Sequence, residues 1–337
     1  MKIAVLLSGG VDSAVTALLL QKEGYDILGL TMINWSSEVA DKAKNLARTL
    51  DIEHQVVDLQ KEFEKDVINY FCQTYEKGYT PNPCVRCNNT IKFGLLLDYA
   101  LAKGADKVAT GHYVRMEYSS IKGRYLIRKA KDISKDQSYF LYGLSQRQLA
   151  HSLFPLGDLT KEEVREIARA YSLPVAESKD SQEICFIAKD YRDFLLDRIS
   201  YTVGPIMDTD NNILGEHKGL PFYTIGQRKG LGISAGKPKY VVELDMVGNR
   251  LIVGDAAELR CSSLLAKDNN FVFMDKLNES MEVGAKIRYS TADAPALITP
   301  LDDGIKVEFL TPQRAITKGQ SVVYYLEDYL VGGGIIE

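Results

Sequence analysis

Along the first half of the chain, short apolar runs alternate with amphipathic stretches. The apolar runs 2–7, 27–33 and 54–59 have the length of buried strands. The amphipathic stretches predict helices over residues 12–23, 38–50, 61–75 and 90–103. Strands that alternate with helices indicate an α/β fold, a doubly wound parallel sheet whose ligands bind at the carboxyl ends of its strands.

The pattern changes after residue 190. Glycine and proline become frequent up to residue 254, which favours a small domain of short strands and turns. Beyond it, short β-rich runs are separated by turn residues, as is typical of a small barrel or sandwich. The 337 residues also exceed the usual size of one domain. We therefore predict an α/β domain over 1–190, a small central domain over 191–254 and a C-terminal β-barrel over 255–337.

A hairpin predicted over 113–129 carries much of a basic stretch. The net charge of the whole chain is −4, so its overall field gives no reason to expect nucleic acid. Between Arg115 and Lys135, however, seven basic residues stand against two acidic ones. This stretch is a candidate for binding phosphates, and the solvated faces of a hairpin are the plainer interpretation.

Composition and cysteine content restrict the class of protein. Hydrophobic residues (45%) and charged residues (26%) are near globular averages. No segment has the roughly eighteen unbroken apolar residues of a membrane span, and Met1 leads into the first strand without a signal-peptide pattern. Five cysteines are an odd number, which argues against a disulfide framework. We expect a soluble cytoplasmic protein whose thiols react or bind metal.

A glycine-containing loop, Ser8-Gly9-Gly10-Val11-Asp12-Ser13, joins the first predicted strand to the first helix. Paired glycines let backbone N–H groups converge on an anion, and the helix N-terminus adds a positive dipole. The loop lacks the Walker lysine and the dinucleotide-binding glycine pattern, but it resembles the pyrophosphate loop of ATP pyrophosphatases, which cleave ATP to AMP and pyrophosphate. An aspartate in such a loop usually serves Mg²⁺, and Asp12 is the candidate.

Two cysteines, Cys84 and Cys87, stand three residues apart in a proline-containing loop just before a predicted helix. We expect the helix N-terminus and Arg86 to favour the thiolate form. A lone Cys-x-x-Cys could also be half of a zinc site or a redox pair, but the sequence has neither a second such pair nor paired histidines to complete a tetrahedron. Cys185 is the natural third thiol.

Several motifs in one order resemble the tRNA-specific 2-thiouridylase (MnmA) family over nearly the whole chain. The matching segments are residues 8–13, 29–35, 81–83 with 87–88, 91–93, 109–113, 135–141, 179–181 with 184–187, and 224–228. The resemblance implies an enzyme of the ATP pyrophosphatase (PP-loop) superfamily that uses ATP and Mg²⁺. It also implies the activity, which is 2-thiolation of the wobble uridine of certain tRNAs.

Binding residues follow from the resemblance by position. Those expected to bind ATP are Leu6, Leu7, Ser8, Gly9, Gly10, Val11, Asp12, Ser13, Met32 and Gly111. Those expected to meet the target base are Asn82, Pro83 and Cys84. Those expected to contact tRNA are His112, Lys135, Asp136, Gln137, Arg288, Tyr289 and Gln320.

The resemblance implies that Cys185 carries sulfur as a persulfide and that Cys87 is its nucleophilic partner, which makes Cys87, Cys185 and Asp12 the catalytic residues. The sulfur would come from a cysteine desulfurase or a relay protein. Many members have aspartate where this chain has Cys84, and three thiols could instead ligate a 4Fe-4S cluster. Two other interpretations are a PP-loop synthetase that adds an amine, and a non-catalytic RNA-binding protein with a structural Cys-x-x-Cys.

Overall fold

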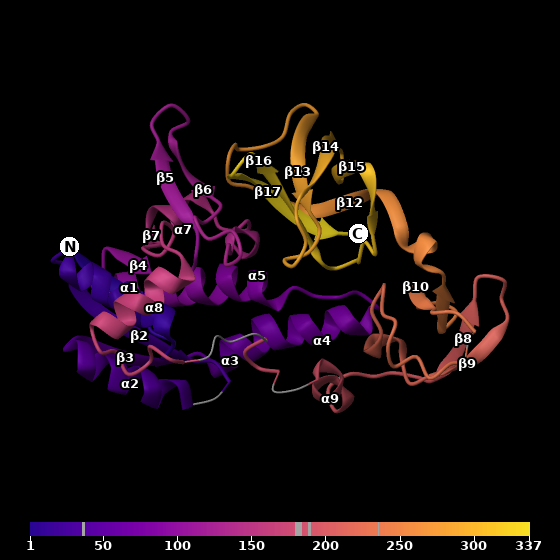
Figure 1. The fold of residues 1–337 in the computed structure, drawn as a ribbon, viewed down its shortest axis with the longest axis horizontal. Helices are drawn as coiled ribbons and strands as arrows, with labels where there is room; N and C mark the ends of the chain where they lie inside the picture. Colours follow the sequence, from indigo (N-terminus) through magenta and orange to yellow (C-terminus); the bar gives the residue numbers. More distant parts are fainter. Residues whose placement is uncertain (36–37, 179–183, 188–189, 235) are drawn as a thin grey trace.

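The computed structural model describes residues 1–35, 38–178, 184–187, 190–234 and 236–337. These residues form a parallel sheet with helices, a small central sheet and a β-barrel (Figure 1). In Figure 1 the parallel sheet lies on the left, the barrel on the upper right and the central sheet on the lower right. The predicted α/β fold with further β domains is confirmed.

The parallel sheet has the strand order β3-β2-β1-β4-β7. Its strands are β1 (Lys2–Leu6), β2 (Asp26–Ile33), β3 (Glu53–Asp58), β4 (Lys107–Ala109) and β7 (Ser152–Leu153). Helices α1 (Val11–Lys22), α2 (Glu38–Leu50) and α8 (Lys161–Ala170) bury apolar residues in one core with β1, and α6 (Leu96–Ala102) packs in another. The order reverses between β1 and β4, which is where ligands bind in such sheets.

Two long helical segments each contain a π-helical stretch. One runs through α3 (Gln60–Phe63), η1 (Glu64–Ile68) and α4 (Asn69–Glu76), and the other through α5 (Pro83–Cys87), η2 (Asn88–Leu95) and α6. The second begins at Pro83 rather than at residue 90, so Cys84 and Cys87 lie in a helix, not in a loop before it. The Asn82 side chain accepts the Val85 N–H, and proline has the φ angle that a first helical position requires.

The central and C-terminal parts are mostly strands. After α9 (Tyr191–Leu196), the central sheet has the order β10-β11-β8-β9. Its strands are β8 (Gly204–Asp208), β9 (Ile213–His217), β10 (Tyr240–Asp245) and β11 (Arg250–Gly254). The barrel strands are β12 (Arg260–Phe271), β13 (Met281–Lys286), β14 (Ala294–Leu301), β15 (Gly304–Arg314), β16 (Ser321–Leu326) and β17 (Tyr329–Ile336). Pairing of β12 with β17 closes the barrel.

A hairpin from the α/β half extends the sheet of the barrel. Its strands are β5 (Arg115–Ser119) and β6 (Arg124–Arg128), and Arg128 pairs with Tyr329 of β17. The remaining short helices are η3 (Ser138–Phe140), α7 (Gln146–Ala150), η4 (Leu220–Phe222) and η5 (Ala256–Leu259). None of the described helices is both long and apolar enough to cross a bilayer.

Most cations of the basic stretch hold this hairpin in place. Arg115 and Arg128 both bind the Asp328 carboxylate, at 2.8 Å each. The others in contact with carboxylates are Arg124 with Asp275, Lys129 with Asp293 and Lys131 with Glu163. Most of these carboxylates come from distant parts of the sequence, so the basic stretch considered by itself has an excess of positive charge. Five of the seven cations thus have carboxylate partners in the structure, and the phosphate-binding role of the stretch stays a prediction.

Candidate nucleotide and thiol site

The loop after β1 is folded so that its backbone can surround an anion. Gly9 has a φ of +73°, and a Cβ there would lie 2.9 Å from the Lys42 Cβ, so only glycine fits without strain. The Ser13 hydroxyl accepts the N–H of Ser8 at 3.2 Å and donates to the carbonyl of Gly10 at 3.0 Å. Helix α1 follows immediately, so its free N–H groups face the loop.

The other expected ATP residues surround the same edge of the sheet. Gly111 follows β4, and a Cβ there would lie 2.9 Å from the Asp12 backbone carbonyl carbon, so this glycine lets β4 approach α1. Met32 is near the end of β2 and is partly buried. Leu7 is buried and donates its N–H to the Leu30 carbonyl at 2.7 Å. The structure thus brings this set together at the carboxyl ends of β1, β2 and β4.

The carboxylate of Asp12 has two partners that sequence reasoning missed. The Lys161 ammonium contacts its two oxygens at 2.7 and 2.8 Å, and the Tyr113 hydroxyl donates to it at 2.7 Å. Lys161 is largely buried and is the first residue of α8, next to the Thr160 cap. The capping box predicts where this helix starts, but it gives no sign that the lysine reaches a loop 149 residues away.

The three candidate thiols act on one another electrostatically. Cys84 and Cys185 are exposed and Cys87 is buried. The Asn34 amide donates to the Cys185 sulfur at 3.4 Å. Burial raises the pKa of Cys87 to about 12, with the Lys92 ammonium opposing the rise and the Cys185 thiol adding to it. Desolvation also raises the pKa of Cys84 and Cys185 despite their access to solvent, again with Lys92 opposing.

The expectation that Arg86 favours thiolates is therefore wrong. Its guanidinium donates to the Asp66 carbonyl at 3.2 Å and lies over the Tyr70 ring, away from the thiols. Lys92, which follows Cys84 and Cys87 on the same helical segment, is the cation that lowers the pKa of all three thiols. Burial outweighs this charge, so the pKa of each thiol lies above its ordinary value.

The barrel positions the segment expected to meet the base. Asn82 is buried, and its amide donates to the Ser321 hydroxyl at 3.4 Å while its oxygen caps α5 through the Val85 N–H. The Tyr142 hydroxyl is 3.2 Å from the same serine oxygen. The Gln320 amide donates to the Thr80 carbonyl at 3.1 Å and to the Pro81 carbonyl at 2.9 Å. Gln320 therefore holds the backbone of the segment that leads into Asn82.

Two of the side chains expected to contact tRNA accept hydrogen bonds from other residues of the protein. The Asp136 carboxylate is buried and accepts hydrogen bonds from the Ala130 N–H and from the N–H and hydroxyl of Ser138. The side-chain oxygen of Gln137 accepts the Tyr113 N–H at 2.9 Å. Both side chains therefore shape the turn that follows the hairpin.

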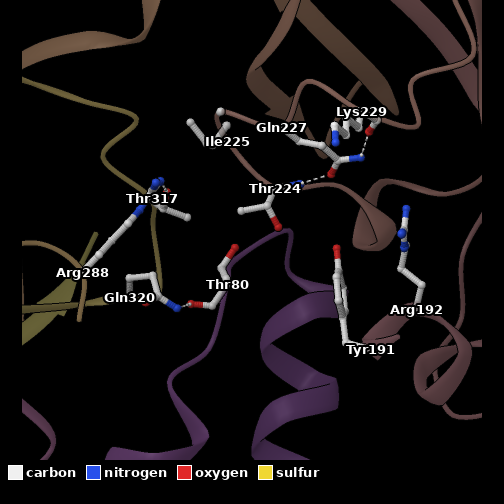
Figure 2. A pocket seen from close by; sticks show the side chains of 11 residues that line it. Thr80, Tyr191, Arg192, Thr224, Ile225, Gln227, Lys229, Arg288, Thr317 and Gln320 are labelled. Atoms are coloured by element: carbon white, nitrogen blue, oxygen red, sulfur yellow. Dashed lines mark hydrogen bonds between the residues drawn. The ribbon is translucent and has the colours of Figure 1, made fainter. Parts of the chain in front are cut away.

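The remaining members of that set lie in three places. Lys135 acts electrostatically on Tyr289. Burial raises the pKa of Tyr289. The charge of Asp136 adds to this rise, and the charge of Lys135 opposes it. Arg288 donates to the Thr317 hydroxyl at 2.8 Å, beside Gln320 in a pocket between domains (Figure 2). His112 follows β4 with its ring 6.0 Å from that of Phe93.

His112 is held neutral in this position. Burial lowers its pKa well below the ordinary value, and the charge of Lys92 adds to the effect. Its Nδ1 lies 2.8 Å from the Thr110 hydroxyl. A neutral imidazole next to the nucleotide edge can exchange hydrogen bonds but does not add positive charge.

A parallel sheet with an anion-binding loop at its switch point, joined to a β-barrel, defines a PP-loop α/β protein with accessory β domains. Family models match consecutive parts of the chain: a tRNA methyl transferase HUP domain over 1–189, a tRNA methyl transferase PRC-barrel domain over 192–255 and an aminomethyltransferase beta-barrel domain over 261–336. Three curated full-length relatives, each named a tRNA-specific 2-thiouridylase MnmA, identify the family more closely.

The relative from Syntrophomonas wolfei is 51% identical over 100% of both chains. The one from Moorella thermoacetica is 50% identical over 99% of this chain and 98% of its own. The one from Thermoanaerobacter sp. strain X514, named MnmA 2, is 48% identical over 100% and 98%. A solved 4-thiouridine synthetase in complex with RNA and ATP aligns with 55% of this chain and 44% of its own, at 17% identity and a TM-score of 0.37. The chain belongs to the tRNA-specific 2-thiouridylase (MnmA) family.

Proposed function

We propose that this protein uses ATP to convert the wobble uridine of tRNA to 2-thiouridine in the cytoplasm. One contact carries the proposal: the Cys185 thiol accepts a hydrogen bond from Asn34, the residue that follows β2. This contact supports a position for Cys185 at the carboxyl edge of the sheet that also has the loop from Ser8 to Ser13. A base that reaches this edge meets the nucleotide and the sulfur carrier together.

In the first step, the C2 carbonyl oxygen of uridine attacks the α-phosphorus of ATP, and pyrophosphate leaves. The loop amides and the α1 N-terminus hold the phosphates. The Asp12 carboxylate is suited to Mg²⁺, which usually takes one or two carboxylates together with substrate phosphates, and which would offset the charge on the leaving group. Lys161, already in contact with Asp12, can turn to the phosphates when the cation takes that carboxylate.

In the second step, the outer sulfur of a Cys185 persulfide attacks C2, and AMP leaves with the former carbonyl oxygen. The Cys87 thiolate then attacks the inner Cys185 sulfur, so the S–S bond breaks and the outer sulfur stays on the base. The products are 2-thiouridine and a Cys87–Cys185 disulfide, which a thiol reductant must reopen before a sulfur donor, such as a cysteine desulfurase or a relay protein, reloads Cys185. Lys92 is placed to assist loss of the Cys87 proton.

A 4Fe-4S cluster would use the same thiols differently. Cysteine sulfurs are the right donors for iron, but the described residues contain no group of three or more His, Cys, Asp or Glu side chains placed to hold a metal. This arrangement does not fit a preassembled cluster, so we derive no step through one.

The direct test is mass spectrometry of tRNA nucleosides after incubation of the protein with ATP, Mg²⁺, a cysteine desulfurase and cysteine. We expect 2-thiouridine to form with stoichiometric AMP and pyrophosphate. A reaction mixture without ATP is the matched control. Consumption of ATP without any thiolated nucleoside, under conditions in which Cys185 is shown to be persulfidated, would rule the proposal out.

A further inference from the structure

Cys84 is a thiol of the candidate site that takes no part in the sulfur transfer proposed above. That transfer needs Cys185 to carry the sulfur and Cys87 to release it. Cys84 is exposed, whereas Cys87, three residues further along the chain, is only 7% exposed. A cysteine differs from the other small polar side chains in that it forms and breaks sulfur–sulfur bonds, so its part in the reaction cycle is to be sought in disulfide exchange.

Cys84 and Cys87 belong to the same short helix, α5, whose first turn is fixed by hydrogen bonds. The Asn82 side chain accepts the Val85 N–H, and the Asn88 N–H donates to the Cys84 carbonyl. Residues three apart in a helix are neighbours on its surface. Two cysteines with this spacing at the start of a helix have the arrangement of redox-active Cys-x-x-Cys pairs, which exchange disulfides with other thiols.

Cys185 is coupled to this pair in two ways. Desolvation raises the pKa of both thiols of the pair, the charge of Lys92 opposes this rise, and the Cys185 thiol adds to it. Phe186, which follows Cys185 in the chain, belongs to the same buried apolar cluster as Cys87. Packing and electrostatics therefore both connect Cys185 with the two cysteines of α5.

The proposed sulfur transfer ends with a Cys87–Cys185 disulfide that blocks the next cycle. Cys185 must be a free thiol before it can accept another sulfur atom. The Cys87 side of this disulfide is buried, so a reductant in solution has little access to it. A thiol that is already fixed on the same helix has an effective concentration far above that of a dissolved reductant. Cys84 is such a thiol.

We propose that Cys84 is the resolving thiol of the cycle, given the sulfur transfer proposed above: its thiolate attacks the Cys87 sulfur of the Cys87–Cys185 disulfide. The Cys84–Cys87 bond forms as the Cys87–Cys185 bond breaks. Cys185 leaves as a thiolate and takes up one proton, which balances the proton lost from Cys84. The two-electron oxidation stays in the protein and moves to the Cys84–Cys87 pair, so Cys185 is free to be loaded again.

A dithiol reductant then completes the cycle at the exposed sulfur. One of its thiolates attacks the Cys84 sulfur, and Cys87 leaves as a thiolate that takes up a proton. The second thiol of the reductant closes its own disulfide and releases Cys84. Loading with sulfur and reduction of the disulfide thus take place on different cysteines.

Disulfide mapping after a single turnover tests this inference. Protein with a persulfide on Cys185 reacts with tRNA, ATP and Mg²⁺ without reductant and is then quenched in acid and alkylated. Trypsin cleaves after Arg86, so a Cys84–Cys87 disulfide links two peptides that mass spectrometry can identify. We expect this disulfide, together with an alkylated Cys185, in the wild type and in the control Cys261→Ser, which changes an exposed thiol outside the site. A final Cys87–Cys185 disulfide in the wild type would overturn the proposal.

A comparison of reductants tests the later step. For each protein, the multiple-turnover rate with thioredoxin, a protein dithiol, is divided by the rate with dithiothreitol, which is small enough to reach either disulfide. An effect of the substitution on base binding cancels in this ratio. We expect the ratio to fall about tenfold or more in Cys84→Ser, because the intramolecular step is lost, and to stay unchanged in Cys261→Ser. An unchanged ratio in Cys84→Ser would contradict the inference.

These experiments separate this inference from the proposed function. If the wild type forms 2-thiouridine and its final disulfide joins Cys87 to Cys185, only the role of Cys84 fails. If the wild type forms no 2-thiouridine from a persulfide on Cys185, the proposed function fails and this inference fails with it.

Discussion

Lys92 is the cation that opposes the effect of burial on the pKa of the three candidate thiols. It lowers the pKa of each clustered thiol against the effect of burial. Replacing it by methionine keeps the length of the side chain and removes the charge, so each thiol should ionise less at a given pH. We predict that alkylation of Cys87 and Cys185 by iodoacetamide slows several-fold at pH 8, as mapped by mass spectrometry. Lys103→Met, at the C-cap of the same helical segment and outside the site, is the control, and an equal slowing there would contradict the prediction.

Asp12 is the residue whose loss should stop ATP cleavage while leaving the fold intact. In Asp12→Asn the side chain can still accept the Tyr113 hydroxyl, but it no longer has the negative charge that suits Mg²⁺. We expect pyrophosphate release to fall by about two orders of magnitude or more, in line with loss of a major electrostatic contribution. Circular dichroism and Tm should stay near those of the wild type. Normal pyrophosphate release would remove Asp12 from the mechanism.

Cys84 separates the two sulfur mechanisms. Under a persulfide relay, Cys84→Asp should be tolerated, because aspartate is expected at this position in many relatives and Cys84 carries no sulfur. As a cluster ligand, Cys84 would be needed for activity with sulfide and for a brown colour in anaerobically prepared protein. We predict a colourless protein whose Cys84→Asp variant thiolates tRNA at a rate within about threefold of wild type. A brown wild-type protein that loses colour and activity on this change would favour the cluster.

At the residue scale, the sequence predicted those features whose residues are contiguous in the chain. The loop from Ser8 to Ser13 is predictable because its glycines and the following helix are contiguous. The contact of Lys161 with Asp12 joins residues far apart in the chain, and no local pattern announces it. The state of Cys87 was predicted wrongly for a related reason: its burial depends on packing against distant residues such as Phe186.

At the scale of elements, the hairpin β5–β6 depends on one carboxylate of the barrel. Partial burial acts to raise the pKa of Asp328, but the hydrogen bond from Arg128 and the charges of Arg128 and Arg115 outweigh it, so the pKa lies below its usual value. A carboxyl group whose pKa is lowered by folding stabilises the fold above its unfolded-state pKa, and this stabilisation is lost as the pH falls through the folded-state value.

Asp328→Asn should therefore lower the Tm by a few degrees at pH 7, because it leaves two arginines without their shared anion. The difference from wild type should shrink as the pH falls from 5 toward 3, where the wild-type carboxylate also becomes protonated. Asp303→Asn, on an exposed barrel loop, is the matched control. A difference in Tm that stays constant with pH would contradict this role of Asp328.

Elements that a local sequence motif marks were predicted correctly. Contacts that depend on the pairing of distant segments were not. The helix from Lys161 follows its capping box, and the first two strands follow their apolar runs. The start of α5 was misplaced because Pro83 was taken to stiffen a loop, whereas with the Asn82 cap it begins a helix. That the hairpin joins the barrel could not be foreseen, since Arg128 and its carboxylate partner Asp328 are 200 residues apart and no motif signals their contact.

At the scale of the whole molecule, the account requires two chemical steps at one edge of the sheet. The loop expected to bind the nucleotide follows β1, the thiols come from α5 and from Cys185, and the barrel holds Asn82 through Ser321. If the steps are distinct, removal of sulfur transfer leaves adenylation in place. A shared structural role for the cysteines would instead disable both steps.

The measurement that tests this most directly follows pyrophosphate and 2-thiouridine together in a single turnover of Cys185→Ser and Cys87→Ser with tRNA, ATP, Mg²⁺ and a sulfur donor. Cys72→Ser, which alters a thiol outside the cluster, is the control. We predict that both variants release pyrophosphate at rates close to the wild type and form no 2-thiouridine, while Cys72→Ser forms both products. Loss of pyrophosphate release together with thiolation, or thiolation that survives in either variant, would contradict the account.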